Sequence, residues 1–336
     1  MNIDLQAREI TPLRQTFAHV ARLIGEGKAA TRYQEATYAR SPWRTFTIAR
    51  RGTPRTSCTT RAAAAIRLAD CEALKDPRQF YYATWTMTRA RQQEAVEANF
   101  QFVESRGLAS AMGDALRDRA LQVLLPLRHV AWGANMNNAV ICAYGYGTAF
   151  TAPAMFHAMD DLGIAQLITR LALTLDEPAV LEAGKLAWLE DPRWQGLRRY
   201  VEDSFVVQDP VELFVAQNLA LDGLLYPLIY GHFVDDHLAL QGGTAVAILT
   251  SFMPEWHDET ARWIDAVIKT MANAAEPEAA GNRALLSQWF SQWADRAQAA
   301  LAPVAEMALG EHGAAALGEV RRAALDARAT KLGLSL

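Results

Sequence analysis

The chain has 336 residues, of which 51% are hydrophobic and 21% are charged, enough apolar material for the core of a globular protein. Its formal net charge of −4 argues against a general nucleic-acid binder. The three cysteines lie far apart, so neither a disulfide framework nor a thiolate zinc site is expected. The N-terminus lacks the apolar core of a signal peptide, and no uninterrupted apolar run reaches the ~20 residues that span a bilayer. We therefore expect a cytoplasmic protein without nucleic-acid or membrane partners.

Residues 1–60 differ from the rest and are predicted to form an extended N-terminal arm. A short helix is expected around residues 13–26, and the stretch after it has scattered aromatic residues without a sustained period of 3.6 or 2. Between residues 49 and 61 every charged residue is an arginine, which fits either a solvated segment or a surface for an anionic partner. An arm without a core of its own is expected to lie on its own domain or on a partner chain.

Residues 61–336 are predicted to form a single all-α domain. One helix is expected to begin with Asp76 as N-cap and Pro77 in its first position, and to stop at Gly107. Strand signals are absent from the pattern. Further along, four long helices are expected to be buried; they cover residues 126–147, 151–177, 209–236 and 244–272.

The order of these segments predicts a four-helix bundle. Shorter helices after Pro178 separate the first two buried segments from the last two, as in bundles with a long crossover connection. Amphipathic, Ala-rich helices follow Pro277 and are expected to lie at the periphery. Nucleotide-binding and nucleophile motifs are missing, because no GxGxxG follows a strand and no GxSxG or GxxxxGK[ST] occurs.

A helical bundle takes its function from the polar groups in its interior. Di-iron bundles use one Glu from each of two helices and a Glu-x-x-His pair from each of two others. That spacing puts both ligands of a pair on one helix face. None of the seven histidines follows a Glu at this interval.

Other polar clusters stay open as candidate metal sites. His157 precedes Asp160 and Asp161 at i+3 and i+4, a reversed arrangement of acid and histidine. Such a face can bring metal ligands together, but a hydrogen bond at a helix end or a contact in a subunit interface is the simpler interpretation.

A second cluster, YGHFVDDH, contains His232, Asp235, Asp236 and His237. Asp236 is four residues from His232, so two ligands can converge there. The cluster also precedes a Gly-Gly pair, which favours a solvated helix end. Asp258 and Glu259, within EWHDE (residues 255–259), are interpreted as first-turn acids that the helix dipole favours.

Four stretches together resemble a known family. They are TRYQEATY, ALKDPRQFYYATWTMTRARQQE, HVAWGANMNNAVICAYGYGTAF and EWHDETARWIDAVIK. They resemble the β subunit of the hydroxylase component of bacterial multicomponent di-iron monooxygenases, with phenol hydroxylases closer than toluene monooxygenases. The resemblance runs from about Pro12 to the C-terminal helices and is interrupted between residues 39 and 60. It implies a ferritin-like helical bundle and a hydroxylase built as a dimer of αβγ units.

The resemblance also implies where a metal site has been lost. In this family the α subunit holds a carboxylate-bridged di-iron centre, and the β subunit has a similar fold without iron. Asp161 lies where α has an acid, and Ile164 takes the place of the histidine three residues later. In the preceding helix, where α has its first glutamate, this chain has Ala131 and Trp132.

The second ligand pair has two possible registers. Glu259 with Arg262 keeps the interval of three, as does His257 with Thr260, and neither is Glu-x-x-His. The resemblance thus implies no catalytic, cofactor-binding or metal-binding residue in this chain. Since an uncompensated buried carboxylate is costly, we expect the interior to have reverted to apolar packing.

The resemblance implies a structural, non-catalytic subunit that supports a di-iron α subunit and the assembly of the dimer. The complex is expected to hydroxylate phenol or related aromatics with O₂ and electrons from NADH. The expected partners are the α subunit, a small γ subunit, a second αβγ protomer, a regulatory protein, and a reductase with FAD and a [2Fe–2S] cluster. The alternative is a ferritin-like metal oxidase with its own site near His232 and Asp236.

Overall fold

The computed structural model describes residues 17–38, 64–69 and 73–336. This part of the chain is built from helices and contains no strand. In chain order the helices are α1 (Ala18–Ile24), α2 (Arg32–Tyr38), α3 (Tyr82–Ser105), α4 (Asp114–Leu124), α5 (Leu127–Tyr144), α6 (Thr148–Leu175), α7 (Val180–Glu190), α8 (Pro192–Ser204), α9 (Pro210–Phe214), η4 (Val215–Leu221), α10 (Asp222–Tyr226), η5 (Pro227–Leu238), η6 (Ala239–Gln241), α11 (Thr244–Thr250), α12 (Phe252–Ala272), α13 (Glu278–Leu309), η7 (Gly310–His312), α14 (Gly313–Val320), η8 (Arg321–Asp326) and α15 (Ala327–Leu332).

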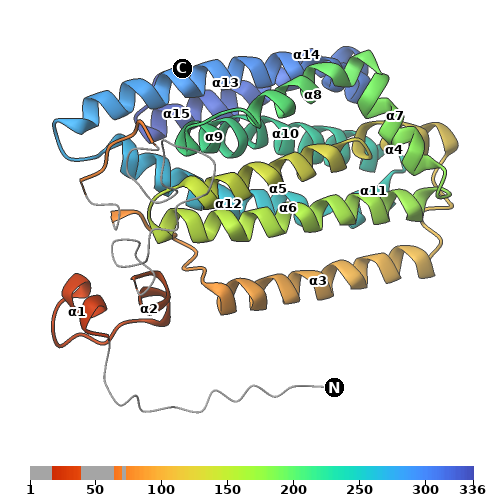
Figure 1. The fold of residues 1–336 in the computed structure, drawn as a ribbon. Helices are drawn as coiled ribbons and strands as arrows, with labels where there is room; N and C mark the ends of the chain where they lie inside the picture. The colour runs from red at the N-terminus through yellow and green to blue at the C-terminus, as the bar shows by residue number, and fades with distance from the viewer. Residues whose placement is uncertain (1–16, 39–63, 70–72) are drawn as a thin grey trace, which may run out of the picture.

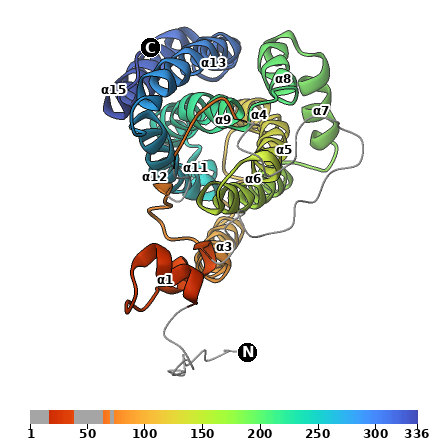
Figure 2. The same cartoon turned by 60° about the vertical axis from the view of Figure 1, so that its left-hand side comes forward.

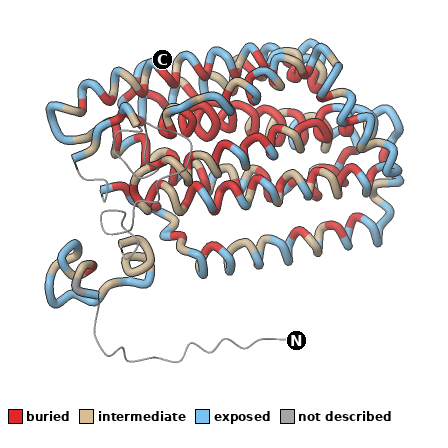
Figure 3. Tube along the Cα trace, viewed as in Figure 1, coloured by how far each residue is buried: buried red, intermediate tan, exposed pale blue. Residues whose placement is uncertain are grey.

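Four long helices form the centre of the molecule, as the sequence predicts. They are α5, α6, the continuous helix from α9 to η6, and α12 (Figures 1 and 2). The helices α7 and α8 form the predicted connection between the first pair and the second. Most buried apolar residues of these elements belong to one hydrophobic core, and Figure 3 shows the buried segments in red along the central helices. Phe156 of α6 packs instead with Phe80 and Trp85 in a smaller cluster.

The helix from α9 to η6, called here the 210–241 helix, is the most buried element. Asp209 caps its start by accepting hydrogen bonds from the backbone N–H groups of Val211 and Glu212. It ends at Gly242, whose φ of 102° suits glycine. Length and a mean hydropathy of 1.3 would let this helix cross a membrane, but 94% of its apolar window is buried inside the protein. Its burial therefore identifies it as a helix of the protein core.

The C-terminal helices lie at the periphery, as predicted. The 32-residue helix α13 packs against α8 and η4, and α14 and α15 lie beside it (Figure 2). The Trp293 indole N–H of α13 donates a 3.1 Å hydrogen bond to the Glu212 carboxylate. This outer layer covers one side of the 210–241 helix, which keeps its apolar surface away from water.

The predicted start of α3 is wrong. Asp76 is not an N-cap: its carboxylate is buried and accepts hydrogen bonds from the backbone and guanidinium of Arg78. Gln79 then adopts φ 54°, which interrupts the chain before the helix. The helix begins only at Tyr82, where a capping box joins Tyr81 and Thr84. The predicted stop near Gly107 is confirmed, with φ 62° at that glycine.

The described part of the arm contains α1 and α2, which lie beside the N-terminal end of α3 (Figures 1 and 2). The helix predicted around residues 13–26 corresponds to α1, whereas α2 falls in a stretch predicted to be extended. The Tyr33 hydroxyl of α2 accepts a 2.9 Å hydrogen bond from the Asp76 backbone N–H. The arginine-rich stretch of residues 49–61 lies outside the described residues.

Candidate functional site

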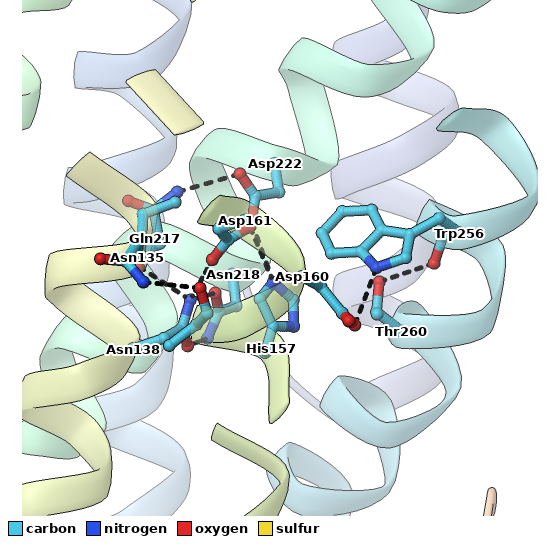
Figure 4. Close-up of polar contacts among 12 residues, drawn as sticks. Asn135, Asn138, His157, Asp160, Asp161, Gln217, Asn218, Asp222, Trp256 and Thr260 are labelled. Atoms are coloured by element: carbon cyan, nitrogen blue, oxygen red, sulfur yellow. Dashed lines mark hydrogen bonds and ion pairs between the residues drawn. The ribbon is translucent and has the colours of Figure 1, made fainter. Parts of the chain in front are cut away.

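Polar side chains from three central helices meet in the middle of the bundle (Figure 4). We call them the central polar cluster: Asn137 and Asn138 of α5, His157 and Asp161 of α6, and Gln217, Asn218 and Asp222 of the 210–241 helix. All are buried. The segment η4 is π-helical, with backbone bonds from i to i+5, which keeps Gln217 and Asp222 on one face.

Amide groups hold this cluster together. Asn138 donates from its Nδ2 to Asp161 Oδ2 and to Asn218 Oδ1, both at 3.1 Å, and Asn218 Nδ2 donates back to Asn138 Oδ1 at 2.9 Å. Asn137 Nδ2 donates to Gln217 Oε1 at 2.9 Å, and Gln217 Nε2 donates to Asp222 Oδ1 at 3.0 Å. These bonds link α5 to both neighbouring helices.

The acids and the imidazole of the cluster are close to one another. His157 Nε2 lies 3.7 Å from Asp161 Oδ1 and 4.0 Å from Asp222 Oδ2. Burial lowers the pKa of His157 well below its usual value, and the positive charges of Arg78 and Arg89 lower it further. The imidazole is therefore neutral at neutral pH.

Burial has the opposite effect on the two carboxyl groups. It raises the pKa of Asp161 well above the usual range, and the neighbouring Asp222 and Asp160 raise it further. Burial also raises the pKa of Asp222 to about 7, against the hydrogen bond from Gln217, which lowers it. Both shifts favour the protonated form of the acid, and at neutral pH Asp222 is near the midpoint of its titration.

Asp160 faces a different set of partners from its neighbour Asp161. It accepts hydrogen bonds from the indole N–H groups of Trp85 (2.9 Å) and Trp256 (3.1 Å). Its carboxylate also lies 2.7 Å from Arg89, which makes a second 2.7 Å contact with Glu259. We call Arg89, Asp160 and Glu259 the α3 clamp, because these contacts join α3 to α6 and α12.

The donors at the centre do not fit a di-iron pair. Such a pair needs four carboxylates and two imidazoles from four helices. Here α5 contributes only amides, α6 and the 210–241 helix contribute one imidazole and two carboxyls, and α12 contributes Trp256 and Thr260. Ile164 is buried in the apolar core. Across the described residues, no group of three or more His, Cys, Asp or Glu side chains is arranged to hold a metal ion.

The geometry of α12 favours the register of His257 with Thr260 over that of Glu259 with Arg262. Thr260 is buried and donates to the backbone carbonyls of Trp256 and His257, while Arg262 is exposed. Glu259 belongs to the α3 clamp, so its interpretation as a first-turn acid is wrong: the acid of the first turn is Glu255.

Three further expectations about the interior need correction. His157 is at neither a helix end nor an exposed surface, since it lies within α6 with 1% of its surface exposed. The position opposite Asp161 in α5 belongs to Asn138, whereas Ala131 packs in the core and Trp132 is half exposed.

Nor has the interior reverted to purely apolar packing. It keeps polar groups because amides and protonation remove most of the cost of burying charge. The signal available in the sequence was the amides within apolar helices, in NMNN (residues 135–138) and QN (residues 217–218). Their meeting point depends on how three helices pack, which the sequence pattern does not contain.

The cluster around His232 is a solvated helix end, as the simpler interpretation held. His232 Nδ1 lies 3.5 Å from Asp236 Oδ2, and the Asp236 side chain is 72% exposed. The His237 ring is directed to Gln241 and Arg119 instead. The two histidines therefore do not converge on one point.

The family model for methane/phenol/alkene hydroxylases matches residues 48–275, more than half of the chain. The chain belongs to this hydroxylase family. The predicted family resemblance is therefore confirmed.

Relatives and a solved structure agree with this assignment. This hydroxylase chain is 44% identical over 336 residues to phenol 2-monooxygenase oxygenase component DmpL of Pseudomonas sp. (strain CF600), covering 99% of this chain and 98% of that protein. It is 22% identical over 244 residues to the hydroxylase component subunit beta of the toluene-4-monooxygenase system of Ectopseudomonas mendocina, covering 70% and 73%. Its fold matches phenol hydroxylase from Pseudomonas sp. OX1 with a TM-score of 0.89 and 38% identity over 99% of both chains. The predicted ferritin-like, all-α fold is confirmed.

Proposed function

We propose that this chain is a structural, non-catalytic β subunit of a multicomponent phenol-type hydroxylase. The observation that carries the proposal is the composition of the central polar cluster. Amide groups, two carboxyl groups with raised pKa values and one imidazole with a lowered pKa fill the position where a catalytic bundle needs four carboxylates and two imidazoles. The name of the toluene monooxygenase relative, a hydroxylase subunit beta, supports the same role.

In this proposal the chemistry belongs to partner chains. A di-iron α subunit uses O₂ to hydroxylate phenol or a methylated phenol, and a reductase with FAD and a [2Fe–2S] cluster delivers electrons from NADH. This chain binds α, a small γ subunit and a second αβγ protomer, and a regulatory protein docks on the assembly. The complex is cytoplasmic.

The outward face of α5 and α6 supports a role in assembly. It exposes large apolar side chains, from Trp132 and Met136 on α5 to Met155, Met159 and Leu162 on α6. None of the fifteen residues from 130 to 144 is charged. Monomeric proteins rarely leave such a face in water, whereas obligate subunit interfaces are apolar and rich in aromatic residues and Met.

A groove of about 620 Å³ extends the outward face of α5 and α6 toward the arm. Its walls come from α2, the start of α3 and the first turns of α6, with Met155 and Phe156 among its lining residues. The face and the groove together provide an apolar surface for the α subunit.

Reconstitution tests the proposal. The purified α subunit and this chain should each fail to hydroxylate phenol with the regulatory protein, reductase and NADH present, and mixing them should restore activity. Hydroxylation by this chain in the absence of α would contradict a non-catalytic role. Full activity of α without this chain would contradict a structural one.

A further inference from the structure

The imidazole of His157 is fully enclosed, yet neither ring nitrogen has a hydrogen-bond partner among the described residues. Oδ2 of Asp222 is also buried and has no hydrogen-bond partner among the described residues. Buried polar atoms in folded proteins nearly always have a partner, either in the protein or in an ordered water. Three polar atoms therefore need to be considered together: His157 Nε2, Asp222 Oδ2 and Asp161 Oδ1.

Their spacing indicates the size of what lies between them. The imidazole Nε2 is 3.7 Å from Asp161 Oδ1 and 4.0 Å from Asp222 Oδ2, both too long for a direct hydrogen bond. Hydrogen bonds of ~2.8 Å that meet at one water at ~80–90° put their partners about 3.6–4.0 Å apart. The observed distances are within the span of one water.

We propose that one buried water molecule bridges His157, Asp161 and Asp222 at the centre of the bundle. Its three partners come from α6 and α10, and three is the usual number of hydrogen bonds for an internal water.

The donors and acceptors around this water balance. Asn138 donates to Asp161 Oδ2, so Oδ1 is the oxygen of Asp161 that can carry a proton and donate it to the water. Gln217 donates to Asp222 Oδ1, which leaves Oδ2 as an acceptor. The water then donates one hydrogen to Asp222 Oδ2 and the other to Nε2 of the neutral imidazole. Every acceptor of the three has a donor.

The bridging water adds a direct connection between two helices. The hydrogen bonds of the amides join α6 to the 210–241 helix through Asn138 of α5. The water joins His157 and Asp161 of α6 to Asp222 without that intermediate. It leaves His157 Nδ1 and Asn137 Oδ1 without a hydrogen-bond partner among the described residues.

A crystal structure of the assembled hydroxylase at a resolution that reveals ordered waters tests this proposal. We expect one isolated density peak within hydrogen-bond distance of all three atoms, without anomalous signal at the iron or zinc edge. An anomalous peak there would mean a metal ion. A direct bond from His157 to Asp161 with no density between would mean that no ligand binds. Either result overturns the proposal.

Two substitutions at one position sharpen the test. Asp222→Asn keeps the shape of the side chain: its Oδ1 accepts from Gln217 and its Nδ2 donates to the water, so its structure should retain the density peak. Asp222→Leu removes the acceptor and fills the space, and its peak should be lost. A peak that persists unchanged in Asp222→Leu, or that is lost in Asp222→Asn, would contradict the bridging geometry. If Asp222→Leu does not assemble, the wild-type and Asp222→Asn structures still decide.

Discussion

Asp161 and Ile164 are three residues apart in α6 but lie in different environments. Burial raises the pKa of the Asp161 carboxyl, which accepts a hydrogen bond from Asn138, whereas Ile164 packs in the apolar core. The sequence alone predicts the loss of the histidine at position 164. It does not predict the amide partners, because Asn138 and Asn218 meet Asp161 only after three helices have packed.

The isoleucine at position 164 is expected to contribute to stability and not to metal binding. Ile164→Ala leaves a cavity in the core and should lower the free energy of unfolding by about 2–5 kcal/mol. The iron content of the assembled hydroxylase should not change. Denaturation and metal analysis of the same preparation check both points, and loss of iron from a fully assembled complex would contradict this role.

Asp222 should make stability depend on pH. Its folded-state pKa is raised to about 7 from 3.8, so the folded chain holds a proton that the unfolded chain releases. The stabilising contribution is fully present below about pH 4 and is lost as pH rises through 7. In Asp222→Asn this fall of the unfolding free energy with rising pH, at most about 4 kcal/mol, should be absent.

Thermal unfolding at pH 5 and pH 8 measures this effect. Relative to the wild type, Asp222→Asn should raise the midpoint of thermal unfolding more at pH 8 than at pH 5. An equal gain at both pH values would show that Asp222 does not titrate in this range.

Among the elements, α3 is the one whose attachment depends most on charged contacts. Its pattern of apolar residues is weak, and of its buried side chains only Trp85 lies in the first half, whereas Val96, Phe100 and Val103 lie in the second. The α3 clamp holds its first half to α6 and α12. The clamp could not be predicted, because its three residues come from three distant segments, and the start of α3 was misplaced because a buried Asp76 looks like an N-cap in sequence.

Arg89→Met is expected to loosen α3. It removes the guanidinium partner of the largely buried Asp160 carboxylate and leaves Glu259 with only the 3.7 Å contact to Arg78, at a cost of about 1–3 kcal/mol. Arg91→Met, at an exposed position in the same helix, serves as the control. Amide hydrogen exchange should become faster across residues 82–90 in the first variant and stay unchanged in the second. Unchanged exchange in both would mean that the clamp does not hold the helix.

At the scale of the whole molecule, the order of buried and peripheral helices was the most predictable feature. Long segments that are apolar around their circumference have to lie inside. The shorter helices between the first and second pair of buried segments predict the long connection between the pairs. The exposed apolar face of α5 and α6 was not predicted, since a segment that is apolar on every side gives no sign of which side stays outside.

That face should be required for assembly. Met159 is 46% exposed near its middle, so Met159→Glu puts a charge into the proposed contact with α and should reduce co-purification of α severalfold. Leu240→Glu, at an apolar position with 82% exposure outside this face, is the matched control. Size-exclusion chromatography measures both. Equal assembly of the two variants would exclude Met159 from the contact with α.

The central claim is that this bundle supports a catalytic partner and carries no iron itself. Iron analysis of the chains after separation of the purified hydroxylase tests this claim most directly. We expect the iron to be found with the α subunit, and this chain to contain far less than one iron per molecule. About two irons bound to this chain, with the spectroscopic signature of a carboxylate-bridged pair, would contradict the account.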